Sequence, residues 1–354
     1  MESTEGGSRR GIAQAVLAAA LFGASTPCAK LLLGNVTPVL LAGLLYAGSG
    51  FGLGTWLLLR RLRGQPLGEG RFAPGDWRWL AGAIAFGGVL GPLLLMLGLA
   101  RTPASSASLL LNLESALTAA IAWVAFRENV DRRIALGMLA IVAGGCVLSW
   151  GGRLDAVPWG ALGIAGACLC WAIDNNLTRV VSGADPVRIA ALKGGVAGCI
   201  NLAIALASGA RWPGAATVAV AALVGLLGYG ISLVLFVRAL RDLGTARTGA
   251  WFATAPFVGA ALALALLRES PGVAFWIAGV LMALGAWLHA SERHAHEHLH
   301  EGMEHDHRHV HDEHHRHAHD FPWDGSEPHA HPHVHEPMRH SHAHYPDLHH
   351  RHRH

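Results

Sequence analysis

Charged side chains are scarce in this 354-residue chain. Asp, Glu, Lys and Arg together make up only 14% of the residues, whereas 52% are hydrophobic. Soluble globular proteins carry about 25% charged residues. The deficit excludes a water-soluble multidomain enzyme and indicates a protein that lies largely in a membrane.

Histidine is absent from the first 288 residues, because all 24 histidines lie from His289 onward. An intramembrane Ser–His pair or an H-E-x-x-H zinc site therefore has no histidine to use in that part of the chain. The few acidic residues there also lack the paired aspartates of a membrane aspartyl protease. We therefore expect that this protein is not an enzyme.

Cysteine is also rare. The five cysteines all fall in apolar stretches, and an odd number in such positions gives no sign of a disulfide framework. We interpret them as small, reduced residues of the core. The pair Cys168 and Cys170 could bind a soft metal, but a lone C-x-C with no histidine nearby is a weak signal.

Long apolar runs, in contrast, fill most of the chain. A helix that crosses the hydrocarbon layer needs about 20 mostly apolar residues, and its backbone polar groups must be satisfied within the segment. We expect an all-α membrane protein with ten transmembrane helices, at residues 12–33, 37–59, 77–99, 103–126, 134–150, 158–181, 187–208, 214–237, 246–267 and 272–290.

Arginine is distributed unevenly between the alternate loops that join these runs. Fifteen arginines fall on the side of the N-terminus, and only Arg101, Arg153, Arg211 and Arg268 fall on the other side. By the positive-inside rule the arginine-rich side is cytoplasmic. We therefore expect a multi-pass protein of the inner (cytoplasmic) membrane with both termini in the cytoplasm. The first run has the look of a cleaved signal sequence, but the internal repeat of the chain argues against cleavage.

The first five runs resemble the last five. LFGASTPCAK (21–30) aligns with CWAIDNNLTR (170–179), TPVLLAGLL (37–45) with DPVRIAALK (185–193), and VAFRE (124–128) with ALLRE (265–269). Because each half has an odd number of spans, the two halves must be inserted in opposite directions. Inverted repeats of this kind place a substrate site near the midplane, between halves that rock to alternate its exposure.

Several motifs recur in the same order in both halves. These are the openings FGAS (22–25) and WAID (171–174), the TP or DP that leads the next span, and the closing segments FRENVDRR and LLRES. Their order resembles the EamA-type permeases of the drug/metabolite transporter superfamily over residues 12–290. The resemblance implies a ten-helix transporter of small organic solutes, commonly an exporter, and names no substrate. The chain departs from the family where a Glu-Pro pair is common, since it has Glu114-Ser115 and Ala255-Pro256 there.

We accordingly divide the chain into a cytoplasmic N-terminus (1–11), two five-helix repeats (12–150 and 158–290) and a C-terminal tail (291–354). Because the chain has no ATP-binding motif, the energy for transport would come from a gradient or a partner. The expected partners are a small-molecule substrate and the lipid bilayer, with no nucleic acid. A homodimer is left open.

Glu114 lies about halfway along the fourth predicted span. A charged side chain near the bilayer centre costs about 2.5 to 3.5 kcal/mol on insertion scales and usually faces the bundle interior or a pathway. We therefore expect Glu114 to carry a proton or to bind a cationic group of the substrate. The alternative is a neutral or paired carboxyl that holds two helices together.

Asp174 and Asn175 interrupt the sixth span just after Trp171. Polar residues in hydrocarbon need partners from other helices or from water. This turn, with Trp171, is the best candidate for substrate contact. In the alternative interpretation, Asp174 only pairs with Arg179 or Lys193.

The chain has only two lysines, Lys30 and Lys193, and both lie inside predicted spans. Each is a candidate for binding a substrate carboxylate or for pairing with Glu114. Lys30 lies toward the outer end of its span, where its side chain could instead extend to the interface.

The tail alternates histidine with acidic residues, alanine and proline. It has almost no apolar periodicity, so we expect it to be disordered on its own. H-x-H spacing lets a flexible segment surround one ion with several imidazoles, so the tail should bind a divalent transition metal such as zinc, nickel or cobalt. The candidate ligands are His294, His296, His298, His300, His305, His307, His309, His311, His314, His315, His317, His319, His329, His331, His333 and His335.

Three roles for metal binding by the tail remain open at this point. It could be a cytoplasmic metal buffer or sensor attached to a carrier of organic solutes. It could feed a carrier that itself exports nickel, cobalt or zinc. It could also sense pH, because unperturbed imidazole has a pKa of about 6.5. The first is favoured, and transport itself is expected to need no cofactor.

Overall fold

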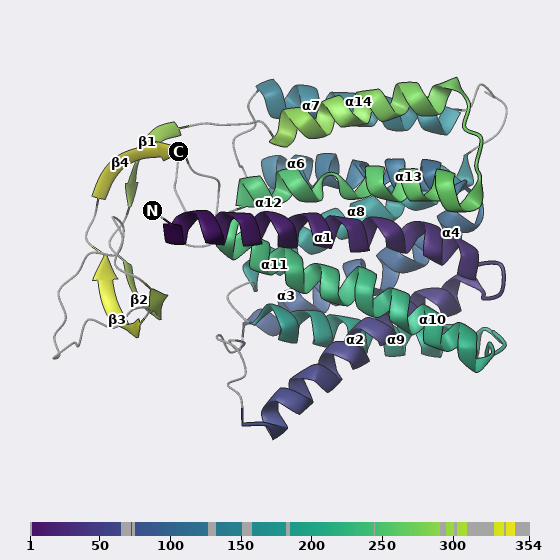
Figure 1. The fold of residues 1–354 in the computed structure, drawn as a ribbon, viewed down its shortest axis with the longest axis horizontal. Helices are drawn as coiled ribbons and strands as arrows, with labels where there is room; N and C mark the ends of the chain where they lie inside the picture. Colours follow the sequence, from purple (N-terminus) through teal and green to yellow (C-terminus); the bar gives the residue numbers. More distant parts are fainter. Residues whose placement is uncertain are drawn as a thin grey trace. The chain divides into compact units, whose positions relative to one another are not determined.

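The computed structural model describes residues 2–64, 72, 75–126, 132–150, 158–181, 185–243, 245–290, 295–300, 303–309, 329–335 and 338–343. The chain divides into two compact units, Met1–Glu292 and Arg293–His354, and each is described by itself. The described elements of the first unit are helices, and those of the second are strands (Figure 1).

The first half of the larger unit has five helical spans. Three of them are the uninterrupted helices α1 (Glu2–Leu32), α2 (Pro38–Leu62) and α7 (Arg132–Trp150). The third span consists of α3 (Asp76–Ala83), the π-helix η1 (Ile84–Leu90) and α4 (Gly91–Ala100). The fourth consists of α5 (Ala104–Leu110) and α6 (Leu113–Phe126), which are separated by a two-residue turn.

The second half repeats this plan. Its uninterrupted helices are α8 (Trp159–Val180), α9 (Pro186–Ala207) and α14 (Val273–Ala290). The eighth span consists of α10 (Ala215–Gly225), the π-helix η2 (Leu226–Ile231) and α11 (Ser232–Leu243). The ninth consists of α12 (Thr245–Phe252) and α13 (Ala255–Leu267), again separated by a two-residue turn.

Interruptions at equivalent places in both halves support the duplication at the level of the backbone. A π-helix divides the third span of each half, and a turn divides the fourth. Single-turn π-segments are rare in helices, so a matched pair is a specific feature of a duplicated unit.

All ten predicted runs are helical, which confirms the all-α prediction. Among the described residues, seven helical segments are long and apolar enough to cross a membrane, and two shorter apolar helices are Ala255–Leu267 and Val273–His289. The remaining span, α8, has 22 residues and carries Asp174, Asn175 and Asn176 in its second half. The chain is therefore an α-helical, multi-pass membrane protein.

The two halves are packed against each other along several helices. α1 of the first half packs on α11 and α13, α8 of the second half packs on α4 and α6, and α2 packs on α9. Small residues permit this close approach. A Cβ atom on Gly23 would collide with the backbone of Ala255, and one on Gly50 with the backbone of Gly194.

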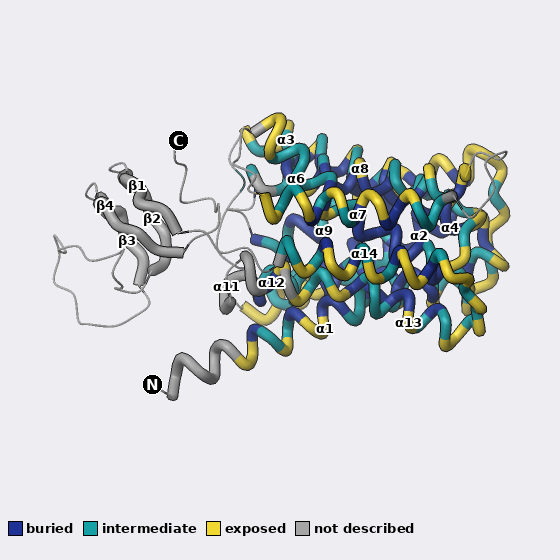
Figure 2. Tube along the Cα trace, turned by 90° about the horizontal axis from the view of Figure 1, so that it is seen from above, coloured by how far each residue is buried: buried dark blue, intermediate teal, exposed yellow. Residues whose placement is uncertain are grey.

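Large apolar side chains cover the outside of the bundle, as expected for a surface in contact with lipid. Phe51, Leu139 and Val280 are 59%, 65% and 69% exposed. Figure 2 shows the buried residues in the middle of the bundle and the exposed ones around its edges. Such a surface would be unfavourable in water but suits a hydrocarbon layer.

The described tail residues form four short strands, β1 (Ala295–His300), β2 (Met303–His309), β3 (His329–His335) and β4 (Met338–Ala343). β1 pairs with β4 and β2 with β3, each as a two-stranded antiparallel sheet. These strands differ from the expectation of a tail without regular structure, because H-x-H repeats share the two-residue period of a strand. A two-stranded sheet is only marginally stable in water, so the strands do not amount to a packed domain.

Candidate functional site

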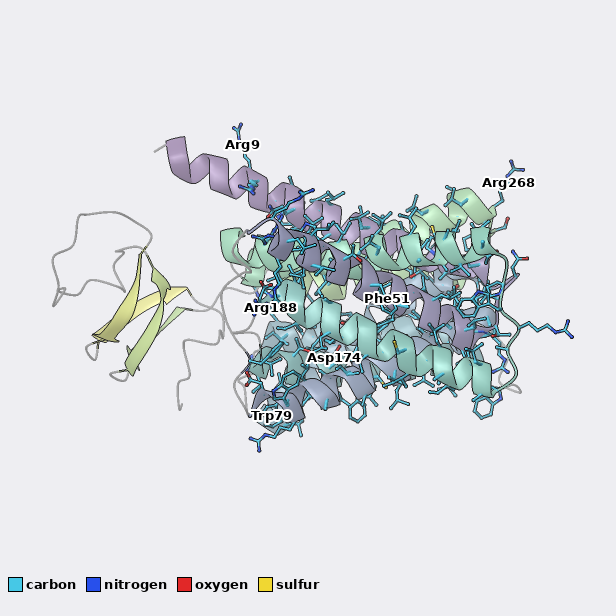
Figure 3. The ribbon with its side chains drawn as sticks, turned by 90° about the horizontal axis from the view of Figure 1, so that it is seen from below. Arg9, Phe51, Trp79, Asp174, Arg188 and Arg268 are labelled. Carbon is cyan, nitrogen blue, oxygen red and sulfur yellow. The ribbon has the colours of Figure 1, made fainter. Side chains whose placement is uncertain are left out.

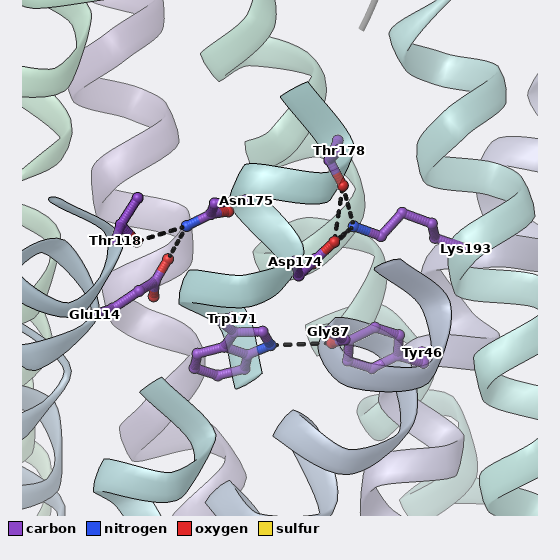
Figure 4. Close-up of polar contacts among 9 residues, drawn as sticks. All are labelled: Tyr46, Gly87, Glu114, Thr118, Trp171, Asp174, Asn175, Thr178 and Lys193. Carbon is purple, nitrogen blue, oxygen red and sulfur yellow. Dashed lines mark hydrogen bonds and ion pairs between the residues drawn. The ribbon is translucent and has the colours of Figure 1, made fainter. Parts of the chain in front are cut away.

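One face of α8 carries several polar side chains in the middle of the bundle. Trp171, Asp174, Asn175 and Thr178 follow one another at intervals of three, one and three residues (Figure 4). Residues three and four apart lie on the same side of a helix. The polar interruption of the sixth span is therefore a stripe, which faces α6 on one side and α9 on the other.

The first partner of this stripe is Lys193 on α9. Its Nζ lies 2.5 Å and 2.7 Å from the two carboxylate oxygens of Asp174, and 3.1 Å from the hydroxyl of Thr178. The Thr178 hydroxyl in turn donates to Asp174 Oδ1 at 2.7 Å. The Lys193 and Asp174 side chains are only 12% and 10% exposed. Two charges that would each be unfavourable in hydrocarbon thus compensate each other.

The second partner is Glu114, which lies in the first turn of α6 directly after the break at Leu111 and Asn112. Its Oε1 accepts a hydrogen bond from Asn175 Nδ2 at 2.8 Å. Within the described part of the chain, Glu114 forms no ion pair. Glu114 is half-buried and Asn175 is exposed, so this pair is more accessible than the ion pair of Asp174. The site therefore contains one compensated carboxylate and one whose polar partner is a neutral amide.

The π-helix η1 forms the wall next to the ion pair. The indole of Trp171 donates to the carbonyl oxygen of Gly87 at 3.0 Å, and the hydroxyl of Tyr46 donates to the same oxygen at 2.9 Å. Asn201 donates to the next carbonyl, of Gly88, at 3.0 Å. A π-helix disrupts the regular α-helical hydrogen-bond ladder, and these side chains supply partners to its carbonyl groups.

Aromatic rings connect this wall to the first helix. The Phe22 ring centroid lies 6.5 Å from that of Trp171 and 6.0 Å from that of Tyr229 in η2. The Tyr229 ring lies 5.4 Å from that of Tyr46. Rings from α1, α2, α8 and η2 therefore form one aromatic cluster beside the charged groups. This combination suits a solute with an apolar body and a charged group.

The structure brings together five of the six predicted substrate residues: Glu114, Trp171, Asp174, Asn175 and Lys193. The sixth, Lys30, lies elsewhere. Its Nζ donates to the carbonyl oxygens of Leu99 and Thr102 at 2.5 Å and 2.8 Å, at the end of α4. A lysine at a helix C-terminus neutralises carbonyl groups that have no partner within the helix.

Sequence reasoning missed the contributions of Tyr46, Gly87, Thr178 and Tyr229 to the site. Gly87 and Gly88 belong to a run that resembles packing glycines, and the sequence carries no sign that a π-helix occurs there. Thr178 could have been found, because it follows Asp174 by one helical turn.

The candidate metal ligands are divided between described and undescribed residues. Among the described residues, no group of three or more His, Cys, Asp and Glu side chains is arranged to hold a metal ion. Cys168 donates to the carbonyl oxygen of Leu110 at 3.6 Å. In the tail, six candidates lie outside the described residues: His294, His311, His314, His315, His317 and His319. The other candidates lie on β1, β2 and β3.

Comparisons with known proteins agree with the fold and the duplication. The model of the EamA-like transporter family matches twice, over residues 9–150 and 158–290. An uncharacterized transporter of Methanothermobacter thermautotrophicus is 27% identical over 293 residues, which cover 77% of this chain and 84% of that protein. One solved crystal structure is similar with a TM-score of 0.58 at 20% identity, over 78% of this chain and 95% of that chain.

Proposed function

This chain belongs to the EamA-like transporter family, which matches both of its halves, and from this premise we propose that it exports a small organic solute by alternating access. The proposed transporter is driven by a proton gradient or another ion gradient across the cytoplasmic membrane. Its substrate site is the cluster of Glu114, Asn175, Trp171, Asp174 and Lys193, because α6, α8 and α9 converge there from both halves.

This proposal rests on the different partners of the two carboxyl groups, Asp174 and Glu114. Asp174 already has a cation in contact with both of its oxygens. Glu114 has an amide partner instead, and it is the more accessible of the two residues. A carboxylate that is removed from bulk water and lacks a cation is stabilised by binding one. Glu114 therefore binds either a proton or the cationic group of the solute, and the aromatic cluster packs against the apolar part of that solute.

If a proton and the solute bind in turn to the Glu114 carboxyl group, transport of the solute is coupled to movement of protons. When Glu114 holds a proton, a cationic solute has no counter-charge to bind. When Glu114 has released its proton, the ionised carboxylate can bind the cationic group of the solute. The fixed pair of Asp174 and Lys193 would keep the rest of the site neutral during this exchange.

Transport by vesicles with an imposed pH gradient tests this proposal. Labelled organic amines, zwitterionic amino acids and neutral sugars would be compared for the full chain and for Glu114→Gln. We expect at least one solute with a cationic group to be transported, and Glu114→Gln to transport that solute at least tenfold more slowly. Asp76→Asn, at the start of α3 and away from the site, makes the same chemical change as a control. Undiminished transport by Glu114→Gln would contradict the proposal.

The tail is proposed to bind transition-metal ions as a cytoplasmic buffer or sensor. The pairing of β2 with β3 places His305 opposite His333, His307 opposite His331, and His309 opposite His329. Alternate residues of a strand share one face, so these three cross-strand pairs share one face of the sheet. Zinc, nickel and cobalt all accept imidazole ligands, which makes them the metals to test.

A second experiment separates metal buffering from metal export. Radioactive nickel, cobalt and zinc would be followed in cells with the full chain, a chain that ends at Ala290, and the full chain with Glu114→Gln. For a buffer, only the two full-length chains retain metal in the cell, and Glu114→Gln changes nothing. Metal efflux that depends on Glu114 would instead establish the alternative function, a transition-metal exporter supplied by the tail.

A further inference from the structure

A cavity of about 330 Å³ lies between α2 and α9, and residues of the candidate substrate site do not line it. Its lining is formed by Leu57, Leu58 and Arg61 of α2 and by Arg188 of α9. Two arginines from different halves of the protein thus line one cavity, together with two leucines. The lining contains no acidic residue.

The antiparallel packing of α2 and α9 produces this convergence. Along the two helices, Gly43 lies against Leu202, Ala47 against Gly198, and Gly50 against Gly194. Continuing in the same direction brings the first turn of α9 beside the last two turns of α2. The two arginines are therefore positioned by a glycine-rich contact between the halves.

Neither arginine is neutralised within the described part of the chain. Arg61 is exposed and Arg188 is half-buried, and no ion pair of either is seen there. The acidic residue nearest to Arg188 in sequence is Asp185, which is buried and accepts a hydrogen bond from the backbone N–H of Val187 at 2.8 Å. Two neighbouring cations without an acid favour an anion between them, and planar guanidinium groups match the geometry of phosphate.

The cavity lies at the arginine-rich end of the bundle. Figure 3 shows Arg188 and Arg9 toward one end and Arg268 at the other. One residue before Arg61, the Arg60 guanidinium lies 4.9 Å from the ring centroid of Trp56. Tryptophan and arginine are both common at the level of lipid headgroups, and basic pockets between spans on the cytoplasmic side bind phospholipid headgroups.

The inverted repeat has no equivalent pair at the opposite end. In the alignment of TPVLL with DPVRI, Arg188 corresponds to Leu40, which is fully buried. Thr37 aligns with Asp185, and extending this alignment along the chain places Gly209 opposite Arg61. The duplicated fold therefore forms its other end without this pair of charges.

We infer that this cavity binds the phosphate group of an anionic phospholipid between Arg61 and Arg188, with the start of an acyl chain against Leu57 and Leu58. The ligand would come from the leaflet at the arginine-rich end. Because it contacts one helix from each half, the bound lipid would also stabilise one relative position of the halves.

Native mass spectrometry of the purified full chain in detergent tests this inference with phosphatidylglycerol as the probe. We expect at least one tightly retained phosphatidylglycerol molecule, and an at least fivefold weaker retention in Arg61→Gln/Arg188→Gln. Arg211→Gln removes an exposed arginine of the opposite end and should change nothing. Arg61→Lys/Arg188→Lys keeps the charge but not the planar fork, so it should restore retention only in part.

Three outcomes would overturn the inference. Phosphatidylcholine could be retained as strongly as phosphatidylglycerol, which would remove the role of net negative charge. Inorganic phosphate could displace the lipid at equal concentration, which would indicate a site for free phosphate. The double Gln variant could retain lipid like the unchanged protein while both melt at the same temperature, which would show that the arginines do not bind it.

Discussion

Asp174 and Lys193 are the residues whose charges depend most strongly on each other. Their side chains are about one-tenth exposed, and both carboxylate oxygens contact the lysine nitrogen. Removing one partner leaves the other charge unpaired, whereas removing both leaves two neutral groups of similar size. The effects of the two substitutions should therefore be far from additive.

We predict that Asp174→Asn and Lys193→Met each lower the free energy of unfolding by about 3 kcal/mol. The double variant should lose less than half of the sum, because no unpaired charge remains. Chemical unfolding in detergent measures all three values. Additive losses of unfolding free energy would show that the two charges are not coupled. Glu114→Gln is the matched control, because it leaves the pair of Asp174 and Lys193 intact.

Among the elements, the π-helix η1 is the one on which the site depends most directly. A Cβ atom on Gly87 would overlap the carboxylate of Asp174, which Lys193 and Thr178 hold in place. The Gly87 carbonyl also receives the hydrogen bonds of Trp171 and Tyr46. Glycine is thus required at this position because a side chain of another helix occupies the space beside it.

Gly87→Ala is therefore predicted to lower the free energy of unfolding by about 1 to 3 kcal/mol and to reduce transport by moving Asp174. Gly195→Ala is the matched control, because a Cβ atom there would meet nothing within 4 Å. That control should be neutral or stabilising by up to about 1 kcal/mol. Equal effects of the two alanines on unfolding and transport would refute the prediction.

The elements were largely predictable from the sequence, while their interruptions were not. Apolar length alone located all ten spans, and the repeat with its VAFRE and ALLRE segments predicted the duplication. The polar triplet at 174–176 indicated the face of α8 that carries the candidate site. The π-helices could not be predicted, because their residues are as apolar as those of the flanking α-helices. Lys30 lies apart from the other predicted substrate residues, and hydropathy could not show this because it does not indicate which way a side chain turns.

For the whole molecule, residues from both halves connect helices at one end of the bundle. Lys30 of the first half binds carbonyl groups at the end of α4. Glu269 of the second half accepts hydrogen bonds from the backbone N–H groups of Ala104 and Ser105, at 2.7 Å and 3.0 Å, at the start of α5. The expected orientation places this end away from the cytoplasm. If this end faces away from the cytoplasm, as we expect, these contacts would hold the outer side closed.

The inverted repeat predicts an equivalent contact at the opposite end of the bundle. Glu128 takes the place of Glu269 in the alignment of VAFRE with ALLRE, at the cytoplasmic end, although it lies outside the described residues. If the halves exchange roles during transport, Glu128 should hold the other end closed. Loss of either carboxylate should then favour opening at its own end only.

Thiol labelling from each side of the membrane tests this prediction. The reporter is Asn175→Cys, introduced after the five native cysteines are replaced, because Asn175 is the exposed member of the site. Glu269→Ala should raise labelling from outside, and Glu128→Ala should raise it from the cytoplasm, each by about tenfold for a shift of about 1.4 kcal/mol between the states. Arg268→Gln, next to Glu269 and exposed, should raise neither. If both alanine variants raised labelling from the same side, the two carboxylates could not be equivalent gates, and the halves would not exchange roles in the way that the duplication requires.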